Sequence, residues 1–233
     1  MANSISIIIP ARNEAESLPG LLTHLFSLPG QEFLKEIIVS DGMSTDETVA
    51  VAAGFGARVT MCSSYGRAFQ MNEGAKRATG SILYFLHADS RPPANFLFEI
   101  MRRVSIGYTA GCFRLRFDHD HWFLKVNAWF TRFDVDAIRF GDQSLFVSKE
   151  CFRQIGGFRE ELIIMEDQEI VKRIKKKGRF CIIPGYVVTS ARKYRVNGIY
   201  RMQAIFFYLY FGYQLGFSQA KLVSQYKKLV RRF

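Results

Sequence analysis

The chain has 233 residues, of which 48% are hydrophobic and 23% charged, an ordinary composition for one globular domain of moderate size. Four scattered cysteines without a C-x-x-C pair argue against a zinc cage or a disulfide framework, and predict buried thiols in a reducing compartment. The formal net charge of +11 suits nucleic acid, anionic lipid or a phosphorylated small molecule, so composition alone does not choose the partner.

Strand and helix signals alternate through the first half of the chain. Short apolar runs predict four strands, at residues 4–9, 35–40, 57–62 and 81–86. Asn13 and Glu16 have the spacing of a capping box, which predicts a helix after the first strand. Ser44 and Glu47 repeat that spacing after the second strand, and a further helix is expected at residues 67–78. This order is typical of a parallel sheet covered by helices on both faces.

The second half of the chain is less regular. Alternating side chains at residues 110–117 predict a strand with one wetter face, and residues 144–147 predict another short strand. A turn at Gly156 and Gly157 precedes an apolar stripe, which predicts a helix that begins at Glu166. We expect one domain with a C-terminal appendage, because no repeat or linker composition divides the chain.

Polar clusters follow three of the predicted strands. They are PARNE at residues 10–14, DGMSTD at residues 41–46 and HADS at residues 87–90. The carboxyl ends of neighbouring parallel strands lie side by side, and carboxylates gathered there are costly unless they bind a cation or a donor-rich ligand. Each cluster alone also fits a helix cap or a turn. Their coincidence at three strand ends favours a ligand site.

These clusters stand in order with GRAFQMNEGAKRATG, GGFRE followed by MEDQEI, and SARKY. In this order and spacing the chain resembles the family 2 glycosyltransferases, from Ile5 to about Asn197. It is most similar to a small bacterial cytoplasmic subgroup with HADS-like and GDQ-like motifs. The resemblance implies the α/β GT-A (Rossmann-like) fold, with a mostly parallel central sheet flanked by helices, over residues 1–197. A nucleotide-binding half would span about 1–90, an acceptor-side half 91–197, and an aromatic and basic helical segment 198–233.

The resemblance implies a site for a nucleotide sugar, with a UDP-sugar favoured. Asp41 would accept the N3 proton of a uracil-type base, and Glu14 would lie near the ribose. The nucleotide-binding residues carried over from the family's motifs are Pro10, Ala11, Asn13, Glu14, Asp41, Arg67, Asn72, His87 and Ala88.

The resemblance also implies a divalent metal ion at the diphosphate. Asp89 matches the last acid of the family's D-x-D motif and would bind Mn²⁺ or Mg²⁺. The first position of that motif is His87 here, which we interpret as lining the site, although Mn²⁺ tolerates imidazole. A hard cation that keeps part of its water shell needs few protein ligands.

The implied general base is Asp167, which would take the proton of an acceptor hydroxyl in an inverting transfer. Glu166 would support it, or serve only the helix dipole. Asp142 and Gln143 match a subgroup motif on the acceptor side, with a simple turn as the alternative. Arg192 matches a basic stretch near the diphosphate, with a solvated loop as the alternative.

Residues 204–217 contain seven aromatic side chains and no charge, and a basic tail follows. The run is too short to cross a bilayer, so it suits an interfacial segment on an anionic membrane, packing on the sheet or a dimer contact. No N-terminal signal is apparent. We therefore expect a cytoplasmic protein with peripheral membrane contact, a hydroxyl acceptor compatible with a lipid carrier, and no specified oligomeric state.

Other function classes fit less well. A nucleotidyltransferase on a related scaffold would need a Gly-rich phosphate loop after the first strand, which PARNE is not. A nucleic-acid-binding module would show an RNP, zinc-finger or helix-turn-helix pattern, and none is found in the sequence. A catalytically inactive relative stays open, although Asp41, Asp89 and Asp167 are all present.

Overall fold

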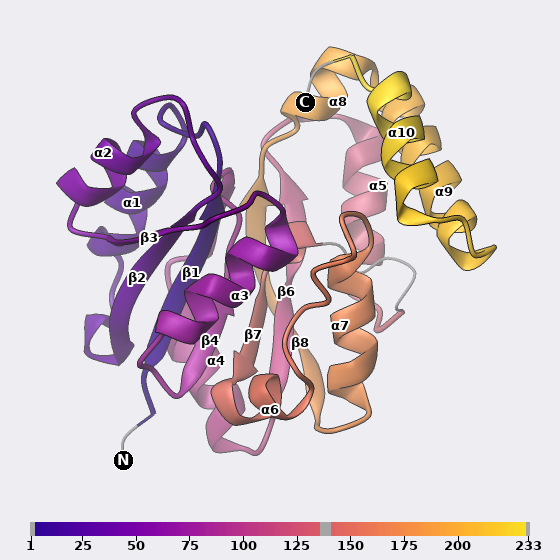
Figure 1. Cartoon of the computed structure of the whole chain (residues 1–233). Coiled ribbons are helices and arrows are strands. Elements are labelled where there is room, and N and C mark those ends of the chain that lie inside the picture. Colours follow the sequence, from indigo (N-terminus) through magenta and orange to yellow (C-terminus); the bar gives the residue numbers. More distant parts are fainter. Residues whose placement is uncertain (1–2, 136–140, 232–233) are drawn as a thin grey trace.

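The computed structural model describes residues 3–135 and 141–231. Its centre is an eight-stranded sheet with the order β3-β2-β1-β4-β7-β6-β8-β5 (Figure 1). The strands are β1 (Ile5–Ala11), β2 (Leu34–Asp41), β3 (Arg58–Met61), β4 (Ile82–Phe85), β5 (Ser90–Arg91), β6 (Ala110–Phe117), β7 (Leu145–Ser148) and β8 (Phe180–Thr189).

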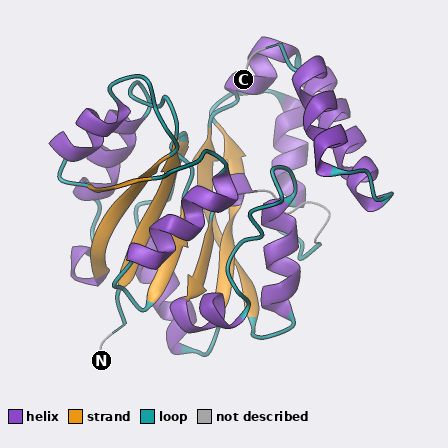
Figure 2. Cartoon of the chain, in the orientation of Figure 1, coloured by secondary structure: helices purple, strands orange, loops and turns teal. Residues whose placement is uncertain are grey.

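Helices cover both faces of this sheet (Figure 2). One hydrophobic core joins the sheet to α1 (Leu18–Ser27), α2 (Thr48–Gly54) and α4 (Phe96–Ser105), and a second joins it to α3 (Arg67–Arg77), α6 (Lys149–Gln154) and α7 (Glu166–Lys175). The other helical elements are η1 (Gln31–Phe33), α5 (Trp122–Phe130), η3 (Gly141–Gln143), α8 (Arg192–Asn197), α9 (Ile199–Gln214) and α10 (Gln219–Leu229).

The parallel half of the sheet follows the sequence prediction. β1 pairs in parallel with β2 and with β4, and β2 pairs in parallel with β3. The second half is mixed, since β7 runs antiparallel to β4 and β6, and β5 antiparallel to β8. In the register of β1 and β2, Ala11 lies opposite Asp41, so the segments that follow both strands leave the sheet at the same edge.

Close packing of α3 against the sheet requires a glycine. A Cβ atom at Gly74 would lie 2.5 Å from both the Ile8 side chain and the Ser40 hydroxyl. The motif that contains Gly74 therefore holds α3 directly over β1 and β2, and this brings its first residue, Arg67, to the carboxyl edge of the sheet. The four cysteines are free and buried, as the sequence predicted.

Two predicted helix starts are wrong. The first helix begins at Leu18 rather than at Asn13, and the second at Thr48 rather than at Ser44. Asn13 has a left-handed backbone conformation (φ 55°) and the Ser44 hydroxyl accepts a hydrogen bond from the Asn13 N–H, so neither residue caps a helix. Both belong to an irregular segment that bridges two strand ends.

The C-terminal helices form a third core of their own with α5 and α8, at the upper right of Figure 1. Within residues 204–217, Ile205 and Leu209 are buried in this core, whereas Phe207 and Phe211 are exposed. Most of the aromatic run therefore lies on one helix, with apolar side chains on both its buried and its exposed side. Among the described residues, no helix has the length and apolar character needed to cross a membrane.

Candidate functional site

The segments after β1 and β2 are joined by side-chain hydrogen bonds. Asn13 Oδ1 accepts from the Thr45 N–H at 2.8 Å, and Ala15 N–H donates to Asp46 at 3.1 Å. The Glu14 N–H donates to Thr48 Oγ1 at 2.8 Å. The predicted nucleotide loops thus form one rigid ledge at the carboxyl edge of the sheet, and Asn13 contributes to it as a cross-link.

Asp41 lies at the centre of this ledge and is fully buried. Its Oδ2 accepts a hydrogen bond from the Ser44 N–H at 3.1 Å, but its Oδ1 has no hydrogen-bond partner among the described residues. A buried carboxylate oxygen without a donor is costly. This oxygen is therefore suited to accept a hydrogen bond from a ligand.

Gln70 is a site residue that the sequence reasoning missed. Its side-chain amide donates to the carbonyls of Ala11 at 2.8 Å and Ser40 at 2.9 Å, which ties α3 to both strand ends. Gly42 leaves room for it, because a Cβ there would lie 2.7 Å from the Gln70 amide. The sequence carries only a weak signal for this role, a glutamine among the small and apolar residues of the predicted helix.

The HADS segment brings a second carboxylate to the ledge. Asp89 is partly buried, and its carbonyl accepts from the Ser190 N–H at 3.2 Å, which fixes the start of the SARKY stretch beside it. Burial raises the pKa of Glu14, the negative charge of Asp89 raises it further, and the charges of Arg192 and Lys193 lower it. Glu14, Asp89 and Arg192 are therefore close enough to influence one another electrostatically.

The donor set fits a metal ion that takes most of its ligands from a substrate. Among residues 3–135 and 141–231, no three His, Cys, Asp or Glu side chains are placed to form a metal cage. Asp89, with Glu14 nearby, offers carboxylate oxygens at a partly open edge, and diphosphate oxygens and water would have to complete the coordination of Mn²⁺ or Mg²⁺.

The histidine that replaces the first acid of the metal motif has a partner on η3. His87 Nδ1 lies 3.2 Å from Asp142 Oδ1, and the imidazole is nearly buried. Burial lowers the pKa of His87, but the hydrogen bond and charge of Asp142 outweigh it, so the pKa is raised. The pair links the segment after β4 to the GDQ motif. Because Asp142 engages Nδ1 of His87, the imidazole lines the site rather than offering this nitrogen to a metal ion.

Arg67 and Glu166 form a second ion pair across the site. Arg67 Nη2 lies 2.8 Å from Glu166 Oε1, with the arginine half-exposed and the glutamate buried. Burial raises the pKa of Glu166 to about 7, although the Arg67 charge opposes this rise. The negative charge of Glu166 raises the pKa of Arg67, and the charges of Asp167 and Asp142 raise it further. This arginine therefore lies among three acids.

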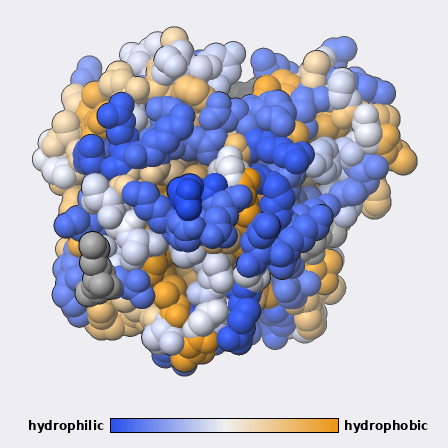
Figure 3. Space-filling view, turned by 60° about the horizontal axis from the view of Figure 1, so that its bottom comes forward, coloured by the Kyte–Doolittle hydropathy of each residue, from blue (hydrophilic) through white to orange (hydrophobic). Residues whose placement is uncertain are grey.

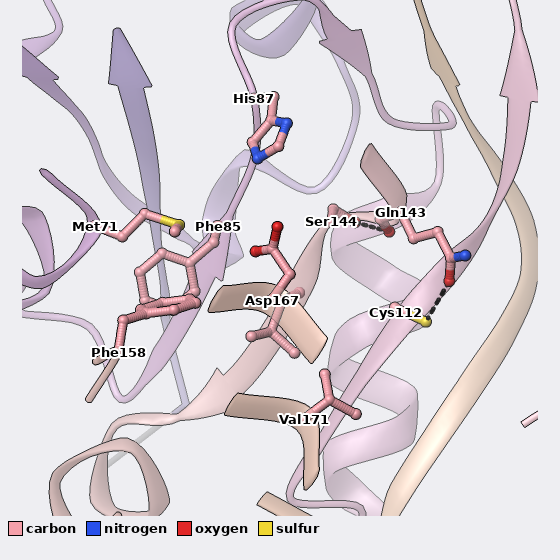
Figure 4. A pocket seen from close by; sticks show the side chains of 10 residues that line it. Met71, Phe85, His87, Cys112, Gln143, Ser144, Phe158, Asp167 and Val171 are labelled. Atoms are coloured by element: carbon pink, nitrogen blue, oxygen red, sulfur yellow. Dashed lines mark hydrogen bonds between the residues drawn. The ribbon is translucent and has the colours of Figure 1, made fainter. Parts of the chain in front are cut away.

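Asp167 follows Glu166 at the start of α7 and faces inward (Figure 4). Its carboxylate points towards His87, above a cavity of about 20 Å³ that is lined mainly by apolar side chains, Met71 and Phe85 among them. A space of that size holds about one water molecule. The carboxylate of the candidate base thus lies between His87 and a small, mainly apolar cavity.

The remaining predicted residues lie in or under the same region. Pro10, Ala11 and Ala88 are buried in or just beyond strands β1 and β4. Gln143 is buried and accepts a hydrogen bond from the Cys112 thiol at 3.4 Å. Both amide hydrogens of Asn72 are used within the chain, by the Phe158 carbonyl and Glu160. The structure thus gives Asn72 a role in holding the segment before α7.

A second residue that the sequence reasoning missed is Gln219, the first residue of α10. Its Oε1 accepts from the N–H groups of Ile163 and Ile164, each at 3.1 Å, and its Nε2 donates to the Ile164 carbonyl at 3.2 Å. Met165, which follows, has a left-handed backbone conformation (φ 71°). The C-terminal hairpin therefore fixes the turn that presents Glu166 and Asp167.

Comparison with known families gives a match over most of the described site. The model of the family described as "Glycosyl transferase family 2" matches residues 6–159. That interval contains all three strand-end clusters, from PARNE to HADS, and the GDQ motif.

Two curated relatives match shorter parts of the chain. A 4,4'-diaponeurosporenoate glycosyltransferase of Staphylococcus haemolyticus is 39% identical over 93 residues, which are 37% of this chain and 24% of that protein. An undecaprenyl-phosphate 4-deoxy-4-formamido-L-arabinose transferase of Proteus mirabilis is 27% identical over 143 residues, 56% of this chain and 44% of that protein. The chain thus spans less than half the length of these relatives.

Solved structures share the fold at low identity. A mannosyltransferase of Pyrobaculum calidifontis in complex with GDP-Man and Mn²⁺ superposes with a TM-score of 0.72 and 18% identity, covering 91% of this chain and 62% of that one. S. aureus TarS 1-349 in complex with UDP-GlcNAc gives a TM-score of 0.65 and 16% identity, covering 80% of this chain and 58% of that one. These likenesses establish the GT-A fold.

Proposed function

The chain belongs to glycosyl transferase family 2, and from this premise we propose that it is an inverting glycosyltransferase that moves a sugar from a nucleotide-diphosphate sugar to a hydroxyl acceptor. The observation that carries the proposal is the buried Asp41 Oδ1, which has no donor among the described residues. The N3–H group of uracil is a donor of the required kind, so a UDP-sugar is the favoured donor substrate.

The diphosphate would lie beyond the base, along the ledge towards Asp89. Arg192 and Lys193, whose charges act on the neighbouring Glu14, are the cations available to it there. A divalent metal ion held at Asp89 would help to neutralise the charge of the departing nucleotide diphosphate. Glu14, partly buried on the same ledge, would accept a hydrogen bond from a ribose hydroxyl.

The transfer step would rely on Asp167. Its carboxylate would take the proton of the acceptor hydroxyl while that oxygen attacks C1 of the sugar and the bond to the diphosphate breaks. Attack from the side opposite the leaving group inverts the anomeric centre. Glu166 would keep Arg67 in place beside this base, since the two side chains are paired at 2.8 Å.

The acceptor hydroxyl would belong to a lipid-carried or a soluble molecule. One relative is named for undecaprenyl phosphate and another for 4,4'-diaponeurosporenoate, which supports testing acceptors carried by lipids as well as soluble ones. A peripheral position at the cytoplasmic face of a membrane would suit such an acceptor.

The test is a panel of UDP- and GDP-sugars, each measured for thermal stabilisation with and without Mn²⁺. A ligand that binds only the native state raises the apparent stability by mass action. We expect UDP-sugars with Mn²⁺ to stabilise most. If no nucleotide sugar shifts the melting temperature at saturating concentration, the proposed function is wrong.

A further inference from the structure

The positive charge of the chain is concentrated at its C-terminal end. Residues 191–233 contain nine of the 32 Lys and Arg side chains and none of the 21 Asp and Glu side chains. The preceding 190 residues are therefore nearly neutral. Arg192 and Lys193 belong to the proposed diphosphate site, and the other seven cations are an excess that indicates a surface for an anionic partner.

Both tryptophans of the chain are exposed on one face of α5. Trp122 is 62% exposed and Trp129 46%, and Val126 and Phe130 on the same face are 43% and 46% exposed. The spacing i, i+4, i+7, i+8 is that of one helix face. Tryptophan is ordinarily well buried, and where exposed it is enriched at protein and membrane interfaces.

Helix α9 extends this face. Tyr200, Phe207, Phe211 and Leu215 are 56%, 50%, 59% and 75% exposed, and they too follow one side of their helix. The ring of Tyr200 lies 6.4 Å from that of Trp122, so the two exposed stripes meet at this end.

Further along, Asn127 of α5 donates to Gln203 of α9 at 3.3 Å. Both contacts lie near the start of α9 and advance in the same chain direction, so α9 begins beside α5 and the two helices point the same way. We call the two stripes together the aromatic face, defined as Trp122, Val126, Trp129 and Phe130 of α5, Tyr200, Phe207 and Phe211 of α9, and Leu215 directly after α9. Figure 3, which keeps the left-right order of Figure 1, shows hydrophobic side chains along the margin on the side of the C-terminal helices.

Cations border the aromatic face. The Arg132 guanidinium lies 4.5 Å above the Trp129 ring. Lys125, on the exposed side of α5, forms an ion pair with Asp120. Residues 122–133 and 191–231 contain no acidic side chain. Aromatic rings with a basic border match the chemistry of the interface of an anionic bilayer.

We propose that this aromatic face binds the interfacial region of an anionic phospholipid bilayer. A second copy of the chain is the other candidate occupant, but a symmetric contact would bring two like-charged borders together, which is unfavourable. Neither α5 nor α9 is long enough to cross a bilayer, so both would lie in the plane of the membrane. The inference rests on exposed side chains and charge and is independent of the transfer chemistry.

The test uses the two tryptophans as internal reporters, because the chain has no others. The full chain is mixed with vesicles of phosphatidylglycerol or of phosphatidylcholine, and its tryptophan emission is recorded. We expect a blue shift with phosphatidylglycerol vesicles and quenching by brominated acyl chains. Phosphatidylcholine vesicles should bind at least about tenfold more weakly, since each nearby cation adds attraction to anionic lipid.

A variant with Val126→Glu and Phe130→Glu places carboxylates between the two reporters and leaves both rings intact. It should lose most vesicle binding, whereas Phe55→Ser, at an exposed aromatic residue next to α2, should not. Circular dichroism confirms that both variants are folded. Unchanged emission of the native chain with phosphatidylglycerol vesicles overturns the proposal, as does a stable dimer in which the tryptophans are shielded without lipid.

Discussion

The guanidinium of Arg67 lies 2.8 Å from a carboxylate oxygen of Glu166, and this pair joins the first residue of α3 to the first residue of α7. Helix α3 is fixed to the strand ends of the nucleotide side by Gln70, while α7 carries Asp167. The ion pair therefore connects the two halves of the site through one contact. Because Glu166 is buried and Arg67 is half-exposed, the glutamate bears most of the cost of this arrangement.

Glu166→Gln should change how stability depends on pH. The folded-state pKa of Glu166 is raised from 4.5 to about 7, so the native state holds a proton that the unfolded state releases earlier. The contribution of Glu166 to stability is present below pH 4.5 and is lost as the pH rises towards 7. The native chain should therefore lose up to about 3 kcal/mol relative to the variant across this window.

Urea unfolding at several pH values measures this difference. Glu161→Gln is the control, because Glu161 is exposed on the segment before α7 and should leave the pH dependence unchanged. Parallel pH profiles for the native chain and Glu166→Gln would contradict the raised pKa.

Asp41→Ala should weaken UDP binding by about 1.5–3 kcal/mol, the cost of one hydrogen bond to a charged group. The reason is that Oδ1 of Asp41 is the buried acceptor available to a base at the end of β2. Asp41→Asn is the closer test, because its amide can keep the bond to Ser44 while losing an acceptor. Calorimetry with UDP and GDP checks the assignment, and equal affinities for both nucleotides in the native chain would refute it.

Asp89→Asn should remove most of the increase in UDP affinity that Mn²⁺ or Mg²⁺ produces. The variant keeps the size of the side chain but loses the charge that a hard cation requires. Asp120→Asn, a change at an exposed acid in the segment after β6, is the control. Calorimetric titrations with UDP in the presence of Mn²⁺ or of EDTA measure the effect. If EDTA leaves nucleotide affinity and activity of the native chain unaltered, the metal role is incorrect.

The strand ends could be predicted from sequence because a parallel sheet places them together whatever their separation in the chain. The helix starts could not be predicted, since the Ser44 hydroxyl and the Asn13 amide bind across two segments rather than to their own helices. A capping prediction assumes that the side chain binds a backbone group in the next turn of the chain. Here the hydrogen-bond partners are 31 and 32 residues away in sequence.

The pairs that complete the site are more distant still. His87 and Asp142 are 55 residues apart, and nothing in either segment specifies the other. The composition of the aromatic C-terminal run likewise did not indicate which of its side chains are buried. Only tertiary packing decides that Leu209 is buried while Phe211 is exposed. The contribution of Trp122 and Trp129 to the same surface depends on the placement of α5.

Gln219→Ala should lower kcat while leaving UDP affinity nearly unchanged. The side chain holds the backbone of Ile163 and Ile164, directly before the left-handed Met165, and does not belong to the nucleotide ledge. A displacement of about 1 Å at a reacting group can cost up to about 10²-fold in rate. Gln219→Glu keeps both acceptor bonds and should recover part of the loss. A parallel rise in the Kd for UDP would indicate general damage to the fold instead.

Asp167→Asn should abolish most transfer while leaving nucleotide binding nearly intact. The asparagine is nearly isosteric but cannot take a proton, and a general base contributes about 10²–10⁴-fold in rate. Asp41 and Asp89 lie on the ledge formed by the segments after β1, β2 and β4, whereas Asp167 starts α7, so the proposed mechanism assigns binding and proton transfer to separate groups. Glu166→Gln, one residue away, is the matched comparison and should lose less activity.

The stereochemistry of the product tests the same assignment by a different route. A single carboxylate base without a placed protein nucleophile implies direct displacement at C1, so the anomeric configuration should invert. Near-normal turnover by Asp167→Asn would remove this residue from the mechanism. Retention of configuration in the product would require a covalent or front-side route, and would exclude direct displacement even if Asp167 proved essential.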